Sequence, residues 1–316
     1  MIWPARLCLS LIVLGWSFAL FKSLRAIKRK KWELGPDSNP AEETVSVSIV
    51  IPARNEERGI QRCILSAREQ DHSSLQFVVF DDASTDNTSP IITRQASNDE
   101  RVVALTGDGA PLPEGWFGKP WALQRAQSEA HGDWLLFIDA DVELHPSAAS
   151  RTLGYALDNE LDMVTGLGEM EMHTFWEKVL QPAVGGLILA GNSLTAVNDP
   201  KQKDINLANG QFILISRIAY DKIGRHTVVK NNILDDVGIA RAVAEAGLLY
   251  HCLHLSELFR CRMYTNFSEI WEGWTKNIFA GLRYSVPNVL LAVLFTFSFS
   301  IFGHLLFVLG AFQLIS

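Results

Sequence analysis

The segment Trp134-Leu-Leu-Phe-Ile-Asp139-Ala-Asp141-Val-Glu143 carries the strongest structural signal in the chain. Its five leading apolar residues predict a short buried strand that stops at an acidic pair. Successive strand residues point to opposite faces, so Asp139 and Asp141 should leave on the same side. Carboxylates this close repel each other unless a cation lies between them, and their oxygens suit Mg²⁺ or Mn²⁺ when phosphates complete the coordination. The pattern predicts a diphosphate site, although an isolated Asp-x-Asp also fits a solvated turn.

The residues before this segment alternate between two kinds of hydrophobic pattern. Short β-branched runs predict strands, and apolar residues at helical spacing predict the helices between them. The predicted strands cover 45–51, 77–80, 102–105 and 134–138, and the predicted helices cover 60–67, 89–97 and 121–130. This alternation predicts an α/β fold with a doubly wound, mainly parallel sheet.

Polar side chains follow three of these strands. Arg54-Asn55-Glu56 follows the first, Asp81-Asp82 the second, and the pair Asp139 and Asp141 the fourth. Ligands of such sheets bind outside the carboxyl ends of the strands, so we expect these residues to share one site. That convergence favours a functional role for the acidic pair.

Composition narrows the choice of partners. The 316 residues carry a net charge of −7, but six of the ten residues from Lys22 to Lys31 are Lys or Arg. An acidic protein with a single basic segment is not a typical nucleic-acid binder. The four cysteines form no Cys-x-x-Cys pair, which fits a reducing compartment.

Both ends of the chain have the composition of membrane spans. Residues 1–22 are apolar enough to cross a bilayer, and the basic residues follow this span instead of preceding it, unlike in a secretory signal. The positive-inside rule then places the residues after 22 in the cytoplasm. Residues 285–316 lack Lys, Arg, Asp and Glu and predict a second span, so we expect a multi-pass protein of the cytoplasmic membrane.

These features divide the chain into five predicted parts. They are a transmembrane helix at 1–22, a basic segment and linker at 23–44, the α/β domain at 45–258, an interfacial segment at 259–284 and a transmembrane helix at 285–316. In the fourth part an apolar stripe fits either an interfacial or a core-packed helix; it comprises Phe267, Ile270, Trp271, Trp274, Ile278 and Phe279. The uncharged stretch 179–197 is expected to be interfacial or acceptor-facing, with a buried helix as the alternative, because Pro182 and three glycines weaken a span.

Three ordered motifs resemble the family 2 glycosyltransferases of GT-A fold. They are Val-Ser-Ile-Val-Ile-Pro-Ala-Arg-Asn-Glu-Glu, Val-Phe-Asp-Asp-Ala-Ser-Thr-Asp-Asn-Thr and Phe-Ile-Asp-Ala-Asp. Gly-Trp-Phe-Gly-Lys-Pro-Trp-Ala-Leu at 115–123 and Trp-Glu-Gly-Trp-Thr-Lys-Asn at 271–277 resemble the membrane-bound hopene-associated and carotenoid-type members. The resemblance covers nearly the whole chain and implies a hexosyltransferase that uses a nucleotide-sugar.

The resemblance implies roles for the residues at the strand ends. Asp82 would hold the nucleoside, with Asn55 and Glu56 lining the same pocket, and carboxylates can accept from base N–H and ribose hydroxyl groups. Lys119 would approach the donor phosphates, and a solvated loop lysine is the alternative. Asp139 and Asp141 would bind the donor and a divalent cation, Mg²⁺ or Mn²⁺, with Asp141 the more direct ligand. An Asx-rich turn that caps a helix at Ser84 or Asp86 is compatible with these roles.

The acceptor side is expected to come from later residues. Asn209-Gly210-Gln211 resembles the family's glycine-containing strand beside the acceptor, and Trp274 would lie on the same side. Asp235-Asp236 occupies the family's Glu-Asp position, with Asp in place of Glu at 235, so Asp236 would be the base that activates an acceptor hydroxyl. The alternative is that both acids only stabilise a helix N-terminus.

Together these features predict an inverting transfer of a hexose, from a UDP-sugar in the first instance, to a hydroxyl of a membrane lipid of hopanoid, carotenoid or glycerolipid type. Two other functions fit part of the pattern. A processive polysaccharide synthase would be expected to carry a Gln/Arg-x-x-Arg-Trp motif, where this chain has Arg260-Cys-Arg262-Met-Tyr264. A non-catalytic sugar-nucleotide binder would need Asp82 and Asp139 but not Asp236.

Overall fold

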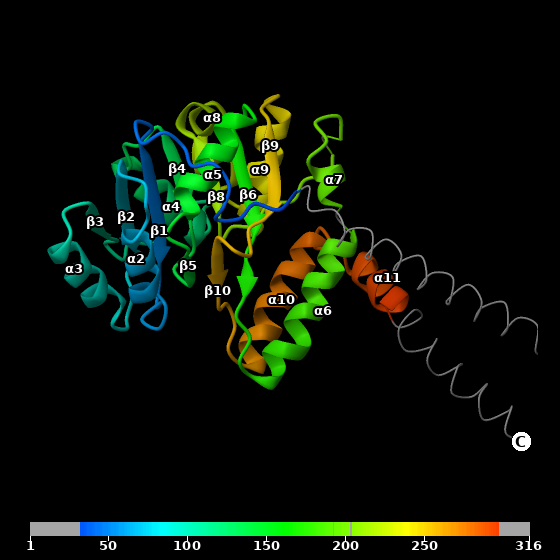
Figure 1. Cartoon of the computed structure of the whole chain (residues 1–316). Coiled ribbons are helices and arrows are strands. Elements are labelled where there is room, and N and C mark those ends of the chain that lie inside the picture. Colours follow the sequence, from blue (N-terminus) through cyan, green and yellow to red (C-terminus); the bar gives the residue numbers. More distant parts are fainter. Residues whose placement is uncertain (1–31, 192, 203, 297–316) are drawn as a thin grey trace, which may run out of the picture. The chain divides into compact units, whose positions relative to one another are not determined.

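The centre of the structure, a computed structural model, is a seven-stranded sheet with the order β3-β2-β1-β4-β8-β6-β9 (Figure 1). Residues 32–191, 193–202 and 204–296 are described. The strands are β1 Val47–Ala53, β2 Leu75–Asp81, β3 Val102–Thr106, β4 Trp134–Phe137, β6 Met163–Leu167, β8 Ile213–Ser216 and β9 Tyr250–His254. The predicted α/β fold with a mainly parallel sheet is confirmed.

One strand of this sheet runs against the others. The β1–β2, β1–β4, β2–β3 and β6–β9 pairs are parallel, whereas β8 is antiparallel to both β4 and β6. Phe137 at the carboxyl end of β4 is opposite Ile213, the first residue of β8. The turn before β8 therefore reaches the same edge of the sheet as the carboxyl ends of the parallel strands.

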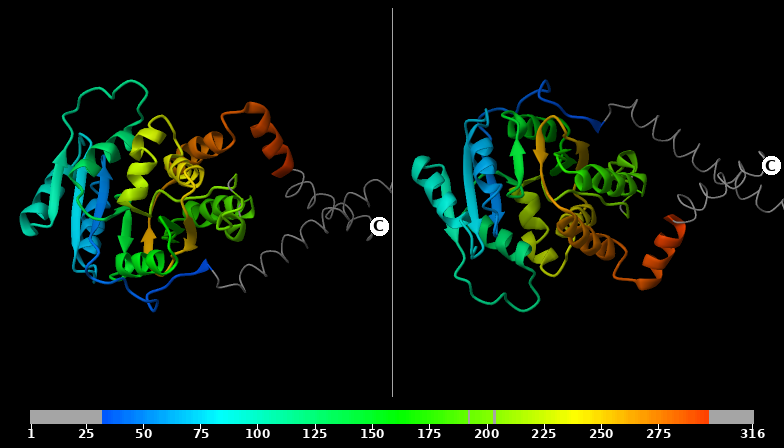
Figure 2. Two further views of the ribbon diagram at one scale, coloured as in Figure 1. Left: turned by 90° about the horizontal axis from the view of Figure 1, so that it is seen from above. Right: turned by 90° about the horizontal axis from the view of Figure 1, so that it is seen from below.

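Helices cover both faces of the sheet, as the perpendicular views show (Figure 2). One apolar cluster includes side chains of α2 Ile60–Arg68, α3 Thr88–Asn98 and α5 Ala148–Asp158. The other includes side chains of α4 Gly118–Ala126, α8 Arg217–Lys222 and α9 Asp235–Glu245. Along β1, Val47, Ile49 and Ile51 belong to the first cluster and Val50 to the second, because strand side chains alternate between faces. Two 3₁₀ turns follow α4 and α8, respectively: η2 Gln127–Glu129 and η3 Arg225–Val229.

A second, three-stranded sheet joins segments that are distant in sequence. It has the order β5-β10-β7, formed by Val142–Leu144, Phe259–Cys261 and Glu169–Met170. Arg62 and Arg260 each pair with Glu143 and Glu171 at N–O distances of 2.6–3.2 Å. These four charges tie α2 to the small sheet next to the acidic turn.

The described residues form four further helices. They are α6 Phe175–Gly191, α7 Leu194–Val197, α10 Phe267–Gly281 and α11 Val286–Thr296. In the stretch 179–197, α6 contains Pro182 and ends at Gly191, and Val179 is exposed, so a fully buried helix is excluded there. The stripe expected on α10 is divided: Ile270 is buried, whereas Phe267 and Trp271 are exposed.

The apolar ends of the chain are only partly described. The predicted span at 1–22 lies outside the described residues, and so do residues 297–316 of the predicted second span. Over 32–191, 193–202 and 204–296, no individual helix has the length and hydropathy needed to cross a bilayer. The segments Phe267–Gly281 and Val286–Leu294, bent by 109° relative to each other, meet those criteria only as a pair.

The described chain divides into two compact units. One unit comprises Trp32–Trp274, and residues 275–296 belong to the other. Part of the predicted linker is packed in the first unit: Leu34 and Ala41 are buried, and their amides donate to His254 and Ser150 carbonyls. Residues 33–44 are mostly polar, so their composition predicted a linker. It does not show that Leu34 and Ala41 are buried.

Candidate active site

The candidate site lies at the carboxyl edge of the large sheet. The loops after β1, β2 and β4 meet there, as predicted for parallel strands. The turn at 209–211 arrives from the opposite direction because β8 is antiparallel, and α9 begins beside it. The predicted site residues on these loops and on α9 come from five separate segments, and Lys119 on α4 and Trp274 on α10 add two more.

Asp139 and Asp141 occupy the tight turn after β4. Val142 N donates to the Asp139 carbonyl at 3.2 Å, and Gly59 at the start of α2 packs against this turn. A Cβ on Gly59 would lie 3.0 Å from the Ala140 carbonyl oxygen, so a larger residue would push the turn away. Burial and the charge of Asp139 raise the pKa of Asp141 to about 6. Asp139 is thus close enough to Asp141 for its charge to disfavour ionisation of Asp141.

The Oδ1 atom of Asp141 is buried and has no hydrogen-bond partner among the described residues. Such an orphaned carboxylate oxygen is costly, and a hard cation is a partner that would satisfy it. In the described part of the chain, no group of three His, Cys, Asp or Glu side chains converges on a metal position. Asp139 and Asp141 therefore fit a cation only if its other ligands come from outside the protein.

Lys119 at the start of α4 lies among the acids. Its Nζ is 2.5 Å from Oδ1 of Asp139. Burial disfavours the ammonium, but the charges of Asp139 and Asp235 outweigh it and raise the pKa of Lys119. Lys119, in the first turn of α4, is therefore paired with an acid.

The loop after β1 is tied to the loop after β2. Asn55 adopts a left-handed φ of 57°, and its Oδ1 accepts from Thr85 N at 2.8 Å. The Asn55 oxygen therefore holds the loops together, a role that its predicted donor-binding function did not include. Burial, followed by the charges of Asp141 and Asp139, raises the pKa of Glu56 to about 7, which places Glu56 near the acidic turn.

Asp82 lies at the same edge. Its Oδ2 is 3.2 Å from a guanidinium nitrogen of Arg54 and 4.0 Å from the position of a Cβ on Gly118. The N-cap residue of α3 is Asn87, not Ser84 or Asp86, but Oδ1 of Asp86 accepts from Thr88 N at 3.0 Å at the start of this helix. Asp82 thus lies next to Gly118, the first residue of α4, which precedes Lys119.

Asp236 lies in this cluster. Its Oδ2 accepts from Gly210 N at 2.9 Å and its Oδ1 from Val237 N at 2.8 Å. A Cβ on Gly210 would lie 3.2 Å from Lys119 Nζ and 3.6 Å from Asp236 Oδ2, so the lysine and this carboxylate share one small volume. Burial raises the pKa of Asp236, and burial together with Asp236 raises that of Asp235 to about 6.

The other acceptor-side candidates, Gln211 and Trp274, are buried and half-buried, respectively. Gln211 is buried and accepts from Asn209 Nδ2 at 3.1 Å. Trp274 packs edge-on against Tyr264, with ring centroids 6.2 Å apart, and its Nε1 is buried without a partner in the described chain. The Tyr264 hydroxyl faces α10 at Gly273, where a Cβ would overlap the ring.

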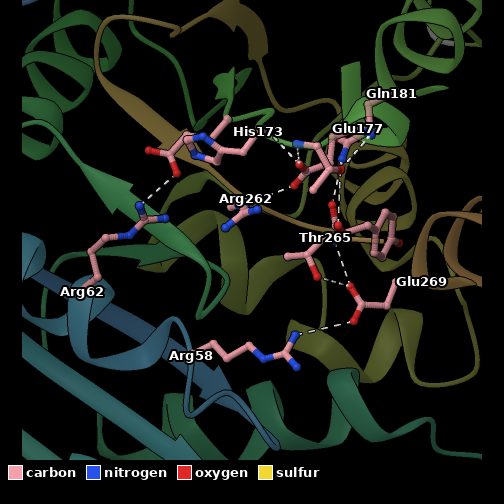
Figure 3. Close-up of polar contacts among 11 residues, drawn as sticks. Arg58, Arg62, His173, Glu177, Gln181, Arg262, Thr265 and Glu269 are labelled. Carbon is pink, nitrogen blue, oxygen red and sulfur yellow. Dashed lines mark hydrogen bonds and ion pairs between the residues drawn. The ribbon is translucent and has the colours of Figure 1, made fainter. Parts of the chain in front are cut away.

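Sequence reasoning missed a group of polar contacts between α6, β10 and α10 (Figure 3). Glu177 is fully buried and accepts from Arg262 Nε at 3.1 Å and from His173 N at 2.8 Å. Gln181 donates to the Tyr264 carbonyl at 3.1 Å, and Arg58 pairs with Glu269 at 3.6 Å. Gly273 lies in the middle of α10, and a glycine at such a position is a local sequence signal that another group packs closely against the helix.

This geometry defines the class of protein: an α/β protein whose candidate ligand site lies at the carboxyl ends of its strands. Residues 48–224, more than half of the chain, match the family described as Glycosyl transferase family 2. The chain belongs to that family and is a glycosyltransferase.

Curated relatives support the carotenoid-type resemblance. The 4,4'-diaponeurosporenoate glycosyltransferase of Staphylococcus haemolyticus (strain JCSC1435) is 25% identical over 256 residues, which cover 80% of this chain and 66% of the relative. The protein of the same name from Staphylococcus aureus (strain USA300) is 26% identical over 270 residues, covering 84% and 68%. The chain thus spans about two thirds of the length of these relatives.

A solved structure supports the GT-A-like fold. Mannosyltransferase PcManGT from Pyrobaculum calidifontis, in complex with GDP-Man and Mn²⁺, superposes with a TM-score of 0.61 over 99% of this chain and 92% of that protein. The two sequences are 17% identical, so the similarity concerns the fold.

Proposed function

We propose that this glycosyltransferase moves a hexose from a nucleoside-diphosphate sugar to the hydroxyl of a membrane lipid of hopanoid, carotenoid or glycerolipid type, with inversion. The observation that carries the proposal is the shared position of Asp139, Lys119 and Asp236 at one edge of the sheet. The names of the curated relatives support a carotenoid-type acceptor, and the apolar ends of the chain support a membrane-bound enzyme with its catalytic unit in the cytoplasm.

The donor would be held by the loops after β1, β2 and β4. Asp82 accepts from the nucleoside, Asn55 fixes the loop carrying Glu56, and Lys119 attracts the diphosphate. Asp139 and Asp141 would hold Mg²⁺ or Mn²⁺, and the partnerless Oδ1 of Asp141 fits that role. The cation supplies positive charge that stabilises the departing nucleoside diphosphate.

Asp236 would remove the proton from the acceptor hydroxyl. Its raised pKa makes it a stronger base than an exposed carboxylate, and two backbone amides keep it in place. Attack from the side opposite the diphosphate inverts the anomeric carbon, so an α-linked donor gives a β-glycoside. Gly210, Gln211 and Trp274 would form the acceptor side of this position.

The test compares membranes containing wild-type protein, Asp236→Asn and Glu245→Gln, given labelled UDP-sugars and lipid extracts. Glu245 is an exposed acid on the same helix. We expect wild type and Glu245→Gln to label a lipid, and Asp236→Asn to lose about 10²–10⁴-fold in rate while still binding donor. Long polymer products would favour a processive synthase instead. Equal labelling by Asp236→Asn would contradict the proposed base.

A further inference from the structure

A hollow lies at the edge of the large sheet opposite the candidate active site, before β4 and after β8. Trp134 at the start of β4 is paired with Ser216 at the end of β8, so the residues just outside these two strands meet there. The hollow has a volume of about 340 Å³. We call it the arginine hollow, and its walls are formed by Gln127, Ser128, Ala130, His131, Arg217 and Arg225. None of these residues has a part in the proposed transfer.

The guanidinium of Arg217 is held in place by uncharged partners. Its Nε donates to the Gly132 carbonyl at 2.8 Å and its Nη2 to the Ala130 carbonyl at 2.7 Å. The charge of Arg217 acts on Asp133, but Oδ2 of Asp133 already accepts from the backbone N and the hydroxyl of Ser46. A guanidinium has five N–H groups, so those that do not bind the two carbonyls stay available to a ligand.

Arg225 reaches the arginine hollow from an unusual backbone conformation. Gly224 and Arg225 both have left-handed φ angles, 88° and 58°. Residues other than glycine seldom adopt this region, and such conformations concentrate at functional sites. Arg225 Nε pairs with Asp221 at 2.8 Å, which leaves its two terminal nitrogens for another acceptor. Because that pair is close to neutral, Arg217 supplies the positive charge of the hollow.

The lining of the arginine hollow suits a phosphate group. Guanidinium groups bind phosphate oxygens with paired, charge-assisted hydrogen bonds, and two of them face this hollow. The ring of His131 adds a further N–H donor, and none of the six lining residues is acidic. The volume lies at the lower end of the range for small-molecule sites. The ligand class is therefore a compact anion that carries a phosphate or diphosphate.

Both walls of the arginine hollow lead to the candidate active site. On one side, η2 continues α4, which carries Lys119 in its first turn. On the other, η3 begins at Arg225 and packs against α4. The Lys230 carbonyl, directly after η3, accepts at 2.7 Å from the backbone N of Phe117, the N-cap residue of α4. An anion held between the two walls would restrict the helix that presents Lys119.

We propose that the arginine hollow binds a phosphate or diphosphate group, and that its occupation raises the affinity of the active site for a nucleoside diphosphate. A ligand that orders α4 in advance reduces the ordering that the nucleotide must bring about, which gives positive coupling between the two sites. The binding itself is independent of the proposed function. Only the coupling rests on it, through the proposed role of Lys119.

The experiment measures the binding of inorganic pyrophosphate to the full-length protein in detergent, without metal, by isothermal titration calorimetry. Wild type is compared with four variants: Arg217→Met, Arg225→Met, Lys119→Met and Arg94→Met. Lys119→Met tests the active site. Arg94→Met is the matched control, because Arg94 is an exposed arginine of α3 that donates to Gln61 at 2.8 Å.

We expect wild type to bind pyrophosphate with a dissociation constant below about 1 mM, and each of the two hollow variants to weaken this binding about tenfold or more, because charge-assisted hydrogen bonds are lost. Lys119→Met and Arg94→Met should retain it. Binding that is lost in Lys119→Met but kept in Arg217→Met and Arg225→Met would place the anion in the active site and overturn the proposal. Arg225 makes no contact with the Ala130 and Gly132 carbonyls, so Arg225→Met decides the test if Arg217→Met does not fold.

The coupling is tested by titrating UDP and GDP with and without inorganic phosphate. With phosphate present, wild type should bind the preferred nucleotide about fivefold more tightly than Arg225→Met does, and without phosphate the two should be equal. Equal affinities under both conditions would contradict the coupling. If neither nucleotide binds while arginine-dependent pyrophosphate binding persists, the proposed function fails and the arginine hollow stands.

A last arm identifies the source of the phosphate. Short-chain phosphatidylglycerol competes with pyrophosphate on wild type, with short-chain phosphatidylcholine as the zwitterionic control. Displacement by phosphatidylglycerol alone would assign the arginine hollow to an anionic lipid head group, and no displacement by either lipid would assign it to a soluble phosphorylated ligand.

Discussion

At the residue scale, the candidate active site concentrates negative charge around the ammonium group of Lys119. Glu56, Asp139, Asp141, Asp235 and Asp236 all influence one another or Lys119 electrostatically. Lys119 lies 2.5 Å from a proposed cation ligand, so it competes for the same oxygen atoms that a divalent cation would use.

Removing this ammonium should strengthen metal binding. We expect Lys119→Met to bind Mn²⁺ at least about tenfold more tightly in the absence of nucleotide, because a unit charge a few ångströms away contributes several kcal/mol at an effective dielectric of about 20. Electron paramagnetic resonance of free Mn²⁺ measures the affinity directly. Lys119→Arg keeps the charge and should stay near wild type; an unchanged or weaker affinity in Lys119→Met would contradict competition at Asp139.

At the element scale, α6 and α10 are joined to β10 by polar contacts that local sequence does not show. Glu177 and Arg262 are distant in the chain, and Tyr264 needs the missing side chain of Gly273. The strand ends were predictable because motif and strand are contiguous in sequence. The packing of α6 against α10 was not predictable, because the apolar stripe on α10 does not indicate which side of that helix contacts α6.

Ionisation of the Glu177 carboxyl group should make the free energy of unfolding depend on pH. Although burial opposes ionisation, backbone amides and Arg262 lower the pKa of Glu177 to about 2 from an ordinary 4.5. A lowered carboxyl pKa stabilises the fold fully above pH 4.5, and this contribution disappears as the pH falls towards 2. We expect Glu177→Gln to lower the free energy of unfolding by about 3 kcal/mol at pH 7, as for a buried pair that loses one partner.

Urea denaturation of wild type and Glu177→Gln between pH 7 and pH 2.5 measures this difference, with Glu245→Gln as the exposed control expected within about 0.5 kcal/mol of wild type. A gap between wild type and Glu177→Gln that stays constant down to pH 2.5 would show that the charge of Glu177 is not involved.

Two helical glycines should respond in opposite directions to alanine. Gly273→Ala would overlap the Tyr264 ring, so we expect a loss of about 1–3 kcal/mol. No described atom lies within 4 Å of a Cβ on Gly185, so Gly185→Ala should gain up to about 1 kcal/mol from helix propensity. Thermal unfolding distinguishes the two, and a similar shift for both would mean that Tyr264 does not contact α10 as described.

At the scale of the whole molecule, much of the fold followed from the sequence. The order of strands and helices up to β4 matched the prediction because each element has its own hydrophobic period. The position of the turn Asn209-Gly210-Gln211 at the candidate site could not be predicted from local sequence, because it depends on the direction of β8 relative to its neighbours in the sheet. The burial of Leu34 likewise depends on His254, which lies at the other end of the unit.

Nucleotide binding should stabilise the entire catalytic unit, because the proposed donor residues belong to loops that join most of the large sheet. A nucleoside diphosphate with Mn²⁺ at about one hundred times its dissociation constant should add about 2.7 kcal/mol to the free energy of unfolding. Thermal unfolding with UDP or GDP, each with Mn²⁺ or with EDTA, measures this and identifies the preferred base. A full shift with EDTA present would argue against a cation held by Asp139 and Asp141.

The pairing of β6 with β9 limits how the enzyme can be divided. The family match stops at residue 224, but β9 lies beyond it and binds β6 along five residue pairs. A fragment that ends at residue 224 would leave β6 as an exposed, apolar edge strand, which could pair with strands of other copies. Truncation there should yield insoluble aggregates. The segment that matches the family should therefore not fold as an independent unit.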